Sequence, residues 1–285
     1  MNTERSFTQG VGRWHGGAEV YDAAGEFAGM GTDSRSVVAD DGVGRVTVDV
    51  SFDGPFSFGG QYTIVDEGKR RRYTGPLNYG LAETLGDGLV DAHNYWHDVG
   101  FSQRLFLMVL PGGGTQLSFA ILSRGERLAW TVAGEYARVG DGDGDLPEIA
   151  APVDGPPLLD RDGSWEGTLQ CLDDALDVTG TTDYAERVDG EAVLIDGSGF
   201  ATAATYDWVR DGDGGFTPPG PVVGSASLSG GRAISGQFHH NAEGLRCWRR
   251  EIATRDGTRK GVVHSWFRGG QRVGIAHGVL EFTAR

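Results

Sequence analysis

The sequence has few cysteines, no long apolar run and little basic charge, and each shortage excludes a class of protein. Cys171 and Cys247 are the only cysteines among 285 residues, too few for the disulfide framework of a small secreted domain. No apolar stretch approaches the roughly 20 residues that a membrane-spanning helix needs. The N-terminus also lacks the apolar segment of a signal peptide. We therefore expect a soluble, cytoplasmic protein without a membrane partner.

Basic residues are too few to favour a nucleic-acid partner. The chain carries 25 Lys and Arg against 40 Asp and Glu, a net charge of −15, whereas a protein that binds nucleic acid needs a basic surface. The one basic cluster, residues 69–72, is interpreted as a solvated turn, because runs of like charge usually face water. We expect no nucleic-acid partner.

Helical periodicity is missing as well, and glycine is abundant. The 48 glycines separate short apolar runs, as tight turns do between short strands. Residues 45–50 alternate polar and apolar side chains, the pattern of a half-buried strand, and residues 105–110 form an apolar run of strand length. About eight such antiparallel strands in each module would close into an up-and-down barrel without exposed edges.

An acidic segment that contains proline divides the chain. Residues 141–163 hold seven acids, one base and four prolines, a composition typical of an interdomain linker. We therefore expect a barrel over residues 1–140, a linker over 141–163 and a second barrel over 164–285. The Asp-Gly repeat in the linker lacks the final glutamate of a calcium-binding loop, since that position is Pro152. No metal site is expected.

The segments on either side of the linker repeat each other. The Gly-Arg-Trp segment that begins at Gly12 matches the Gly-Ser-Trp segment that begins at Gly163, 151 residues later. Farther on, residues 92–94 match residues 239–241 at an offset of 146 or 147. Matches that keep their order on both sides of a linker indicate an internal duplication.

The Gly-x-Trp segment that opens both modules carries a family resemblance. In an all-β module of this size it resembles the opening motif of lipocalins and their calycin relatives. The resemblance implies that Trp14 and Trp165 close one end of each barrel beneath a basic residue near the last strand, Arg138 and Arg285 respectively. Tandem calycin arrangements are similar to the hydratase, isomerase and pericyclic-cyclase proteins of natural-product pathways.

Imidazole and phenol side chains mark the candidate catalytic strands. Alternation along residues 91–98 puts two imidazoles and a phenol on one face, where they can act as general acid and base. The other interpretation is that this face is exterior and Trp96 packs inward. In the second copy His239 and His240 point to opposite faces, so one of them should face the interior. The candidate catalytic residues are His93, Tyr95, His97, His239, His240 and His264.

Tryptophan and arginine side chains are the candidates for ligand binding. Arg246, Trp248 and Arg250 share one face of a strand, with Arg249 on the opposite face. Inward arginines beside tryptophan would suit an anionic or conjugated ligand. The alternative is that arginine stems cover surface aromatics. The candidate ligand-binding residues are Trp96, Trp208, Trp248, Arg250 and Trp266.

These features predict an all-β fold of two lipocalin-like barrels in tandem and leave three functions open. The first is a cyclase, isomerase or hydratase without a cofactor that folds an apolar, polyketide- or terpenoid-like molecule in a dry cavity. The second is a carrier of a hydrophobic ligand or of haem. Nitrobindin-like haem proteins, which the chain also resembles, would place the haem ligand at His277. The third is a structural protein whose barrels are filled by side chains.

Overall fold

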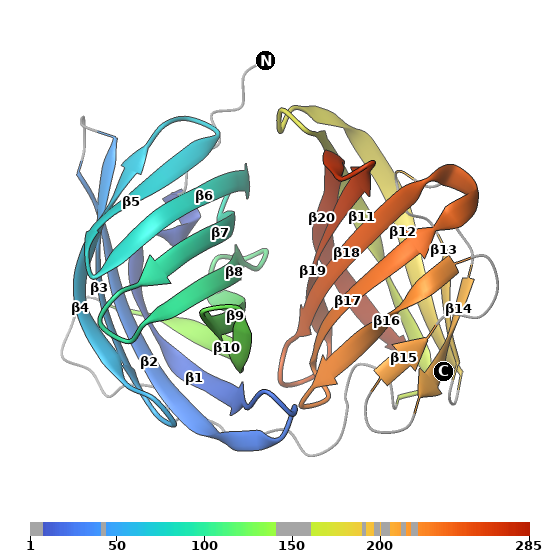
Figure 1. The fold of residues 1–285 in the computed structure, drawn as a ribbon, viewed down its shortest axis with the longest axis horizontal. Coiled ribbons are helices and arrows are strands. Elements are labelled where there is room, and N and C mark those ends of the chain that lie inside the picture. The colour runs from blue at the N-terminus through green and yellow to red at the C-terminus, as the bar shows by residue number, and fades with distance from the viewer. Residues whose placement is uncertain are drawn as a thin grey trace. The chain divides into compact units, whose positions relative to one another are not determined.

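Each half of the chain forms a closed antiparallel β-barrel (Figure 1). The computed structural model describes residues 8–40, 44–140, 161–189, 192–196, 200, 206–211, 215–217 and 222–285, and between 189 and 221, apart from residue 200, it describes only the backbone. The chain divides into two compact units, residues 1–152 and 153–285. Within the described residues the helical elements are two 3₁₀ turns, η1 (Thr8–Gly10) and η2 (Asn241–Glu243). The predicted all-β fold is therefore confirmed.

The first barrel is a meander of ten strands. They are β1 (Gly12–Tyr21), β2 (Phe27–Asp40), β3 (Arg45–Asp53), β4 (Phe58–Asp66), β5 (Arg70–Pro76), β6 (Asn78–Gly86), β7 (Leu89–Trp96), β8 (Phe101–Val109), β9 (Thr115–Arg124) and β10 (Arg127–Val139). Each strand pairs with its neighbours in sequence, and β1 also pairs with β10. A closed meander pairs the backbone groups that an open sheet would expose at its edges.

Strand β3 illustrates how the sequence specifies this barrel. Its side chains alternate between the solvent and the interior, and Val46, Val48, Val50 and Phe52 are buried, as the period of two predicts. The seam between β1 and β10 depends on Gly16, where an added Cβ would lie only 2.1 Å from a backbone carbonyl oxygen of β10. The apolar alternation therefore selects the inner face, and a missing side chain lets the barrel close tightly.

Two expectations about this barrel are wrong. It has ten strands and not about eight, because the glycine-rich β4 and the arginine-rich β5 are strands although their sequences show no clean alternation. The basic cluster at residues 69–72 is not a solvated turn, since most of it belongs to β5. Arg71 is buried, and its guanidinium lies 3.9 Å from the Asp66 carboxylate.

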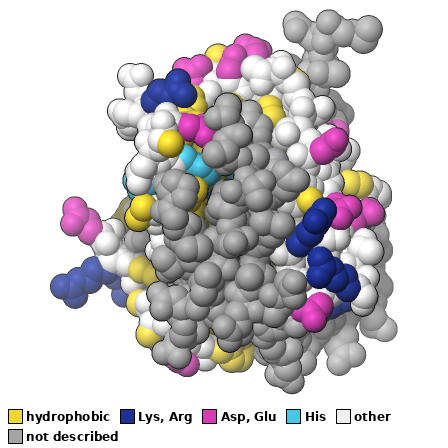
Figure 2. All heavy atoms as spheres, turned by 90° about the vertical axis from the view of Figure 1, so that its right-hand side faces the viewer, with side chains coloured by type: hydrophobic (Ala, Val, Ile, Leu, Met, Phe, Trp, Pro, Cys, Tyr) yellow, Lys and Arg dark blue, Asp and Glu magenta, His cyan; other side chains and the backbone are white. Residues whose placement is uncertain are grey.

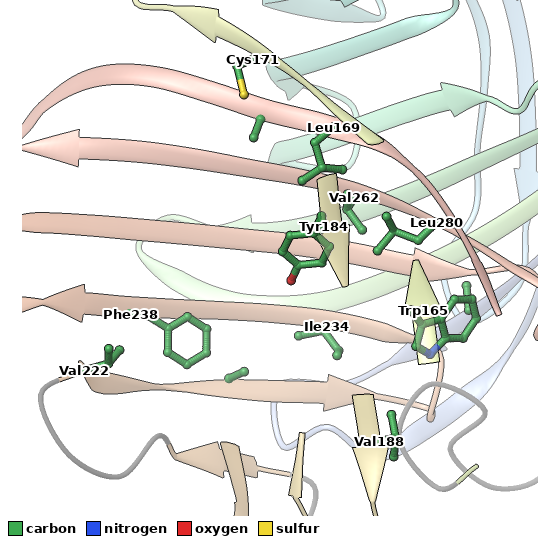
Figure 3. Packing of buried hydrophobic residues seen from close by; sticks show 13 residues of the cluster. Trp165, Leu169, Cys171, Tyr184, Val188, Val222, Ile234, Phe238, Val262 and Leu280 are labelled. Carbon is green, nitrogen blue, oxygen red and sulfur yellow. The ribbon is translucent and has the colours of Figure 1, made fainter. Parts of the chain in front are cut away.

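The second barrel repeats the ten-strand meander. Its strands are β11 (Gly163–Asp173), β12 (Val178–Asp189), β13 (Ala192–Asp196), β14 (Tyr206–Asp211), β15 (Gly215–Thr217), β16 (Val222–Ser229), β17 (Ala233–His240), β18 (Leu245–Ala253), β19 (Arg259–Arg268) and β20 (Gln271–Ala284), and β20 pairs back onto β11. Figure 3 shows part of its buried core, with Trp165 at one end and Cys171 and Phe238 toward the other. The predicted linker, apart from its last three residues, lies outside the described residues and stays a prediction.

The strand pairings within the two barrels correspond residue by residue. Trp96 pairs with Asn78 and Phe101, and His240 pairs with Val222 and Leu245, each 144 residues later. The same offset holds through the remaining strands, whereas the first strands keep an offset of 151. The pairing therefore aligns His240 with Trp96 and not, as the sequence match suggested, with residues 93–94.

The tryptophan plugs are present in both barrels, but their covers differ. Trp14 is buried, donates a hydrogen bond to the Gly10 carbonyl at 3.0 Å and lies 4.5 Å beneath the Arg138 guanidinium, as the resemblance implied. Trp165 is also buried, but the ring that covers it is Phe282, at 4.9 Å. The Lys260 ammonium also lies 5.2 Å from the Trp165 ring, and the cover by Arg285 stays a prediction.

Candidate functional site

A cavity of about 90 Å³ lies inside the first barrel. Strands β2 to β5 and β7 to β10 line it, and most of the lining is apolar or aromatic. The volume is several times what one water molecule needs. The polar side chains of the lining are Asp33, Arg35, Tyr62, Tyr73, Asn94, Gln103, Gln116, Ser118 and Tyr136.

An ion pair on β2 holds the two charged groups of the cavity. Asp33 and Arg35 are two residues apart on one strand, so both side chains point inward. Arg35 Nε donates to the two Asp33 carboxylate oxygens at 3.0 and 3.1 Å, and Arg35 Nη2 donates to the same carboxylate. Arg35 Nη1 donates to Gln116 Oε1 at 3.3 Å. Burial works against the charge of Arg35, but Asp33 raises its pKa above the ordinary value, so the guanidinium stays charged.

Tyr136 on β10 packs against this pair. Its ring lies 4.2 Å from the Arg35 guanidinium carbon, and its hydroxyl hydrogen-bonds to Ser118 Oγ at 3.0 Å. The hydroxyl occupies the space above Gly134, where an added Cβ would collide with it at 1.9 Å. Burial raises the pKa of Tyr136 to about 12 although the nearby Arg35 lowers it. The phenol therefore keeps its proton at neutral pH.

Two further phenols on the opposite wall carry hydroxyls without a hydrogen-bond partner among the described residues. Tyr62 on β4 and Tyr73 on β5 stack with their ring centroids 5.6 Å apart. Burial raises the pKa of Tyr73 to about 12 and that of Tyr62 further still. Both are thus neutral donors at physiological pH, and they are available to a molecule in the cavity.

Strand β7 contributes an amide to the same cavity. Asn94 is only 3% exposed and lines the cavity, yet its Oδ1 has no hydrogen-bond partner among the described residues. Two residues along, Trp96 donates from Nε1 to Gln103 Oε1 at 2.8 Å. A buried amide without a partner is costly unless water or a ligand satisfies it.

Aromatic rings surround the end of the cavity opposite Trp14. Phe52 on β3 stacks on Phe56 at 4.8 Å, and Phe56, on the loop between β3 and β4, also contacts Phe101 and Trp130 at 5.6 and 5.9 Å. Phe58 contacts Trp96 at 4.6 Å. The cavity therefore offers polar groups in its middle and flat apolar surfaces at this end.

The interior of the second barrel holds a cluster of buried ions. Arg249 contacts Glu186 at 3.1 Å and Glu251 at 2.9 Å, and Lys260 contacts Glu251 at 2.8 Å and also Glu186. His264 Nε2 hydrogen-bonds to Glu251 Oε1 at 2.8 Å. All five residues are at most 2% exposed. We call these five residues the ion cluster.

Charge is balanced within the ion cluster. Burial would raise the pKa of Glu251, but Arg249, Lys260 and the hydrogen bond from His264 hold it well below its ordinary value. Burial and then the charge of Arg249 lower the pKa of His264 to about 4, against the pull of Glu251. His264 is therefore neutral at pH 7, and two cations face two carboxylates.

The structure separates the candidate catalytic residues of the first copy from its cavity. His93 and Tyr95 are exposed on the outer face of β7, and His97 is exposed in the turn after it, while Asn94 and Trp96 of the strand point inward. The interpretation in which Trp96 packs inward is the one the structure shows. The three side chains therefore do not meet a molecule in the cavity, and of the two sets of candidates in this copy only Trp96 does.

The candidates of the second copy divide between the two faces of their barrel. His240 is buried and lies 5.2 Å from the ring of Trp266, so one of the paired histidines faces inward as predicted, and His239 is exposed. His264 belongs to the ion cluster, and Trp266 belongs to a buried cluster with Cys247.

Other ligand-binding candidates lie on the outer face of the second barrel. Arg250 stacks on Trp248 at 4.1 Å on the face opposite Arg249, but it is only 1% exposed, so it is not the surface arginine of the alternative interpretation. His277 alternates with the core residue Ala276 and is likewise on the outer face, which makes it unsuitable as a haem ligand inside this barrel. The side chain of Trp208 lies outside the described residues.

Sequence reasoning missed the residues that line the cavity. Asp33 and Arg35 lie in a polar stretch of β2 that looks solvent-facing, and only their alternation with the buried Val37 indicates that they point inward. Tyr136 has a clearer signal, since it lies two residues before the plug cover Arg138 on the same face of β10.

Other groups within the described residues limit the available chemistry. Cys171 and Cys247 are buried free thiols whose pKa values burial raises, so they are poor nucleophiles. Among these residues no three His, Cys, Asp or Glu side chains gather as metal ligands would. On the part of the surface that Figure 2 colours by type, acidic and basic side chains are intermixed.

The described residues include two short helical turns. None of their helices has the length and the apolar character that a bilayer crossing requires.

Comparisons with known proteins give a fold and no family. No family model and no curated protein matches the chain. A protein of unknown function from the DUF3598 family of Nostoc punctiforme is 13% identical over 99% of this chain and 100% of its own, with a TM-score of 0.58. This likeness shows a shared fold over the whole length.

Two weaker likenesses do not bear on function. An S-type phycobiliprotein lyase from Guillardia theta is 13% identical over 50% of this chain and 95% of its own, with a TM-score of 0.38. Kievitone hydratase from Nectria haematococca is 10% identical over 99% of this chain and 92% of its own, with a TM-score of 0.25.

Proposed function

We propose that the first barrel binds a small, largely apolar molecule that carries one polar group. The observation that carries this proposal is an aromatic-lined cavity in which the buried Asn94 Oδ1 has no hydrogen-bond partner among the described residues. Ligand pockets combine an apolar lining with a few placed polar groups in this way. A ring system of the polyketide or terpenoid kind would meet the rings of Phe52 and Phe101 and present an oxygen to the middle of the cavity.

The interior of the second barrel differs from that of the first, and this difference supports the assignment of ligand binding to the first barrel. The space that the cavity occupies in the first barrel is taken in the second by the charged side chains of Arg249, Glu251 and Lys260, which bond to one another. A buried network of this kind leaves no apolar surface for a ligand at that level. Binding is therefore assigned to the first barrel alone.

A second candidate function is acid–base conversion of the bound molecule without a cofactor. The arrangement of Asp33 beside Tyr136 favours it, because a carboxylate can accept a proton while a phenol that keeps its proton donates a hydrogen bond to a developing oxyanion. Isomerisation, cyclisation and addition of water each need such a pair. In this function Asp33 is the base and Tyr136 the donor.

Binding is tested with a substitution that places a larger side chain inside the cavity. Ala120 lines the cavity on β9, and its neighbour Ile121 points to the outer face. We expect the fluorescent probe N-phenyl-1-naphthylamine to bind the native protein, and Ala120→Phe to weaken binding by at least about tenfold because the new ring occupies the ligand volume.

Ile121→Phe, the matched control, should bind the probe as the native protein does. Equal binding by native protein and Ala120→Phe would place the probe elsewhere and overturn the proposal. Once a native ligand is found by native mass spectrometry, Asp33→Asn separates the two functions: retained binding with lost turnover indicates catalysis, and unchanged turnover contradicts it.

A further inference from the structure

The polar groups of the cavity also indicate what kind of polar group the ligand carries. We infer that the ligand is uncharged at its polar end and bears a hydroxyl, which Asn94 and Arg35 recognise together. This inference rests on the proposed binding function and narrows it to a chemical class: planar phenols and enols, as opposed to carboxylic acids.

Charge balance in the cavity argues against an anionic ligand. Asp33 and Arg35 are the only charged residues among the described residues of the cavity lining, and they bond to each other through both carboxylate oxygens. A carboxylate ligand would add a second buried anion beside Asp33, with one guanidinium to serve both. Burial of a charge without its own partner is strongly unfavourable, so the cavity should prefer a neutral group.

The hydrogen-bond inventory argues for a group that both donates and accepts. Arg35 directs three of its five N–H groups to Asp33 and Gln116, which leaves two donors without an acceptor among the described residues. Asn94 Oδ1, in contrast, is a buried acceptor without a donor. A hydroxyl can accept from the guanidinium and donate to the amide oxygen, whereas a ketone can do only the first and a carboxylate cannot donate at all.

The rings around the cavity set the shape of the rest of the ligand. Tyr62 stacks on Tyr73 on one wall. Phe52 and Phe58 stack on each other, with their ring centroids 5.5 Å apart and an interplanar angle of 12°. Flat aromatic faces favour offset stacking with another flat ring. The class is therefore a planar ring system with a hydroxyl on its edge.

A matched series of naphthalenes tests this inference. Naphthalene, 2-naphthol and 2-naphthoate share one ring system and differ only in the polar group, and each can displace N-phenyl-1-naphthylamine at pH 7. We expect 2-naphthol to bind about five- to tenfold more tightly than naphthalene, the gain of one or two buried hydrogen bonds. We expect 2-naphthoate to bind more weakly than naphthalene.

Variants of adjacent residues on β7 attribute the preference to the cavity. Asn94→Leu should reduce the advantage of 2-naphthol over naphthalene to about twofold or less, with naphthalene binding retained as the sign of an intact cavity. His93→Ala, on the outer face of the same strand, should leave all three affinities unchanged.

The outcomes separate this inference from the proposed function. If 2-naphthoate binds as tightly as 2-naphthol or more tightly, or if Asn94→Leu keeps the full preference for 2-naphthol, the hydroxyl class is wrong while the binding function stands. If neither N-phenyl-1-naphthylamine nor any naphthalene binds, the proposed function fails and the inference fails with it.

Discussion

The two barrels share a topology and a register but fill the same interior positions with opposite chemistry. Leu105 and Ala120 face each other across β8 and β9 in the first barrel, and the equivalent pair in the second is Arg249 and His264. Leu107 likewise corresponds to Glu251. At this level the first barrel is lined by apolar side chains, and the second holds the ion cluster.

The difference shows that the strand pattern specifies the barrel, while a few inward positions decide what the barrel contains. Both interiors alternate correctly with the outer face, so the backbone closes in the same way around leucines or around ions. The first arrangement lines a cavity of about 90 Å³. A duplicated fold can therefore divide its tasks, with one copy for a ligand and the other for stability.

The largest expected effect comes from replacing Glu251 of the second barrel with leucine, the residue type at the equivalent position of the first barrel. Glu251→Leu removes a carboxylate from Arg249, Lys260 and His264 and leaves buried cations facing Glu186 alone. We expect the free energy of unfolding of the second barrel to fall by about 3–5 kcal/mol. Urea denaturation measures it, with Leu107→Met at the equivalent position as a control that costs less than about 1.5 kcal/mol. A loss below about 1 kcal/mol would show that the ion cluster does not hold this barrel together.

The next largest expected effect is a loss of stability of the second barrel at acidic pH. The pKa of His264 is about 4 in the folded chain and about 6.5 when unfolded. Between these values the unfolded state binds the extra proton, so the stability that is full above pH 6.5 is lost as the pH falls toward 4, by up to about 1.4 kcal/mol per pH unit. His240, whose pKa burial also lowers, adds to this slope.

The control for acid sensitivity is His264→Gln, which keeps a donor to Glu251 but does not titrate. Denaturation curves between pH 7 and pH 4.5 should show a shallower slope for this variant than for the native protein. An identical slope would assign the acid sensitivity to other groups.

The smallest expected effect concerns the plugs. Arg138 stacks on Trp14 and donates to the Gly113 and Val11 carbonyls at 2.9 and 2.6 Å, whereas the ring of Phe282 lies against Trp165 at 4.9 Å. Arg138→Ala should lower the free energy of unfolding of the first barrel by about 2 kcal/mol. Arg285→Ala should change that of the second by less than about 0.5 kcal/mol. Equal effects in thermal denaturation would mean that the two plugs are covered alike.

The sequence alone predicted the plugs and the strand class better than the cavity. The Gly-x-Trp motif occurs in both copies and marks Trp14 and Trp165, and the family resemblance that it carries adds Arg138. The alternation of β3 is visible directly in its sequence. Alternation defines two faces but does not say which is inside, so the sequence leaves open whether His93 or Trp96 points into the barrel. Asp33 and Glu251 were missed for a related reason, since a buried ion looks like a surface residue until its partner from a distant strand is known.

The pairing of β1 with β10 has a consequence for the order in which the first barrel is assembled. β1 can pair with β2 at once, but its second partner, β10, is made only after the eight strands between them. Contacts so distant in sequence form late and slowly. Arg138, which covers the Trp14 plug, lies on that last strand. During synthesis, the closure of the barrel by the β1–β10 pairing and the covering of Trp14 by Arg138 therefore occur together as the last step.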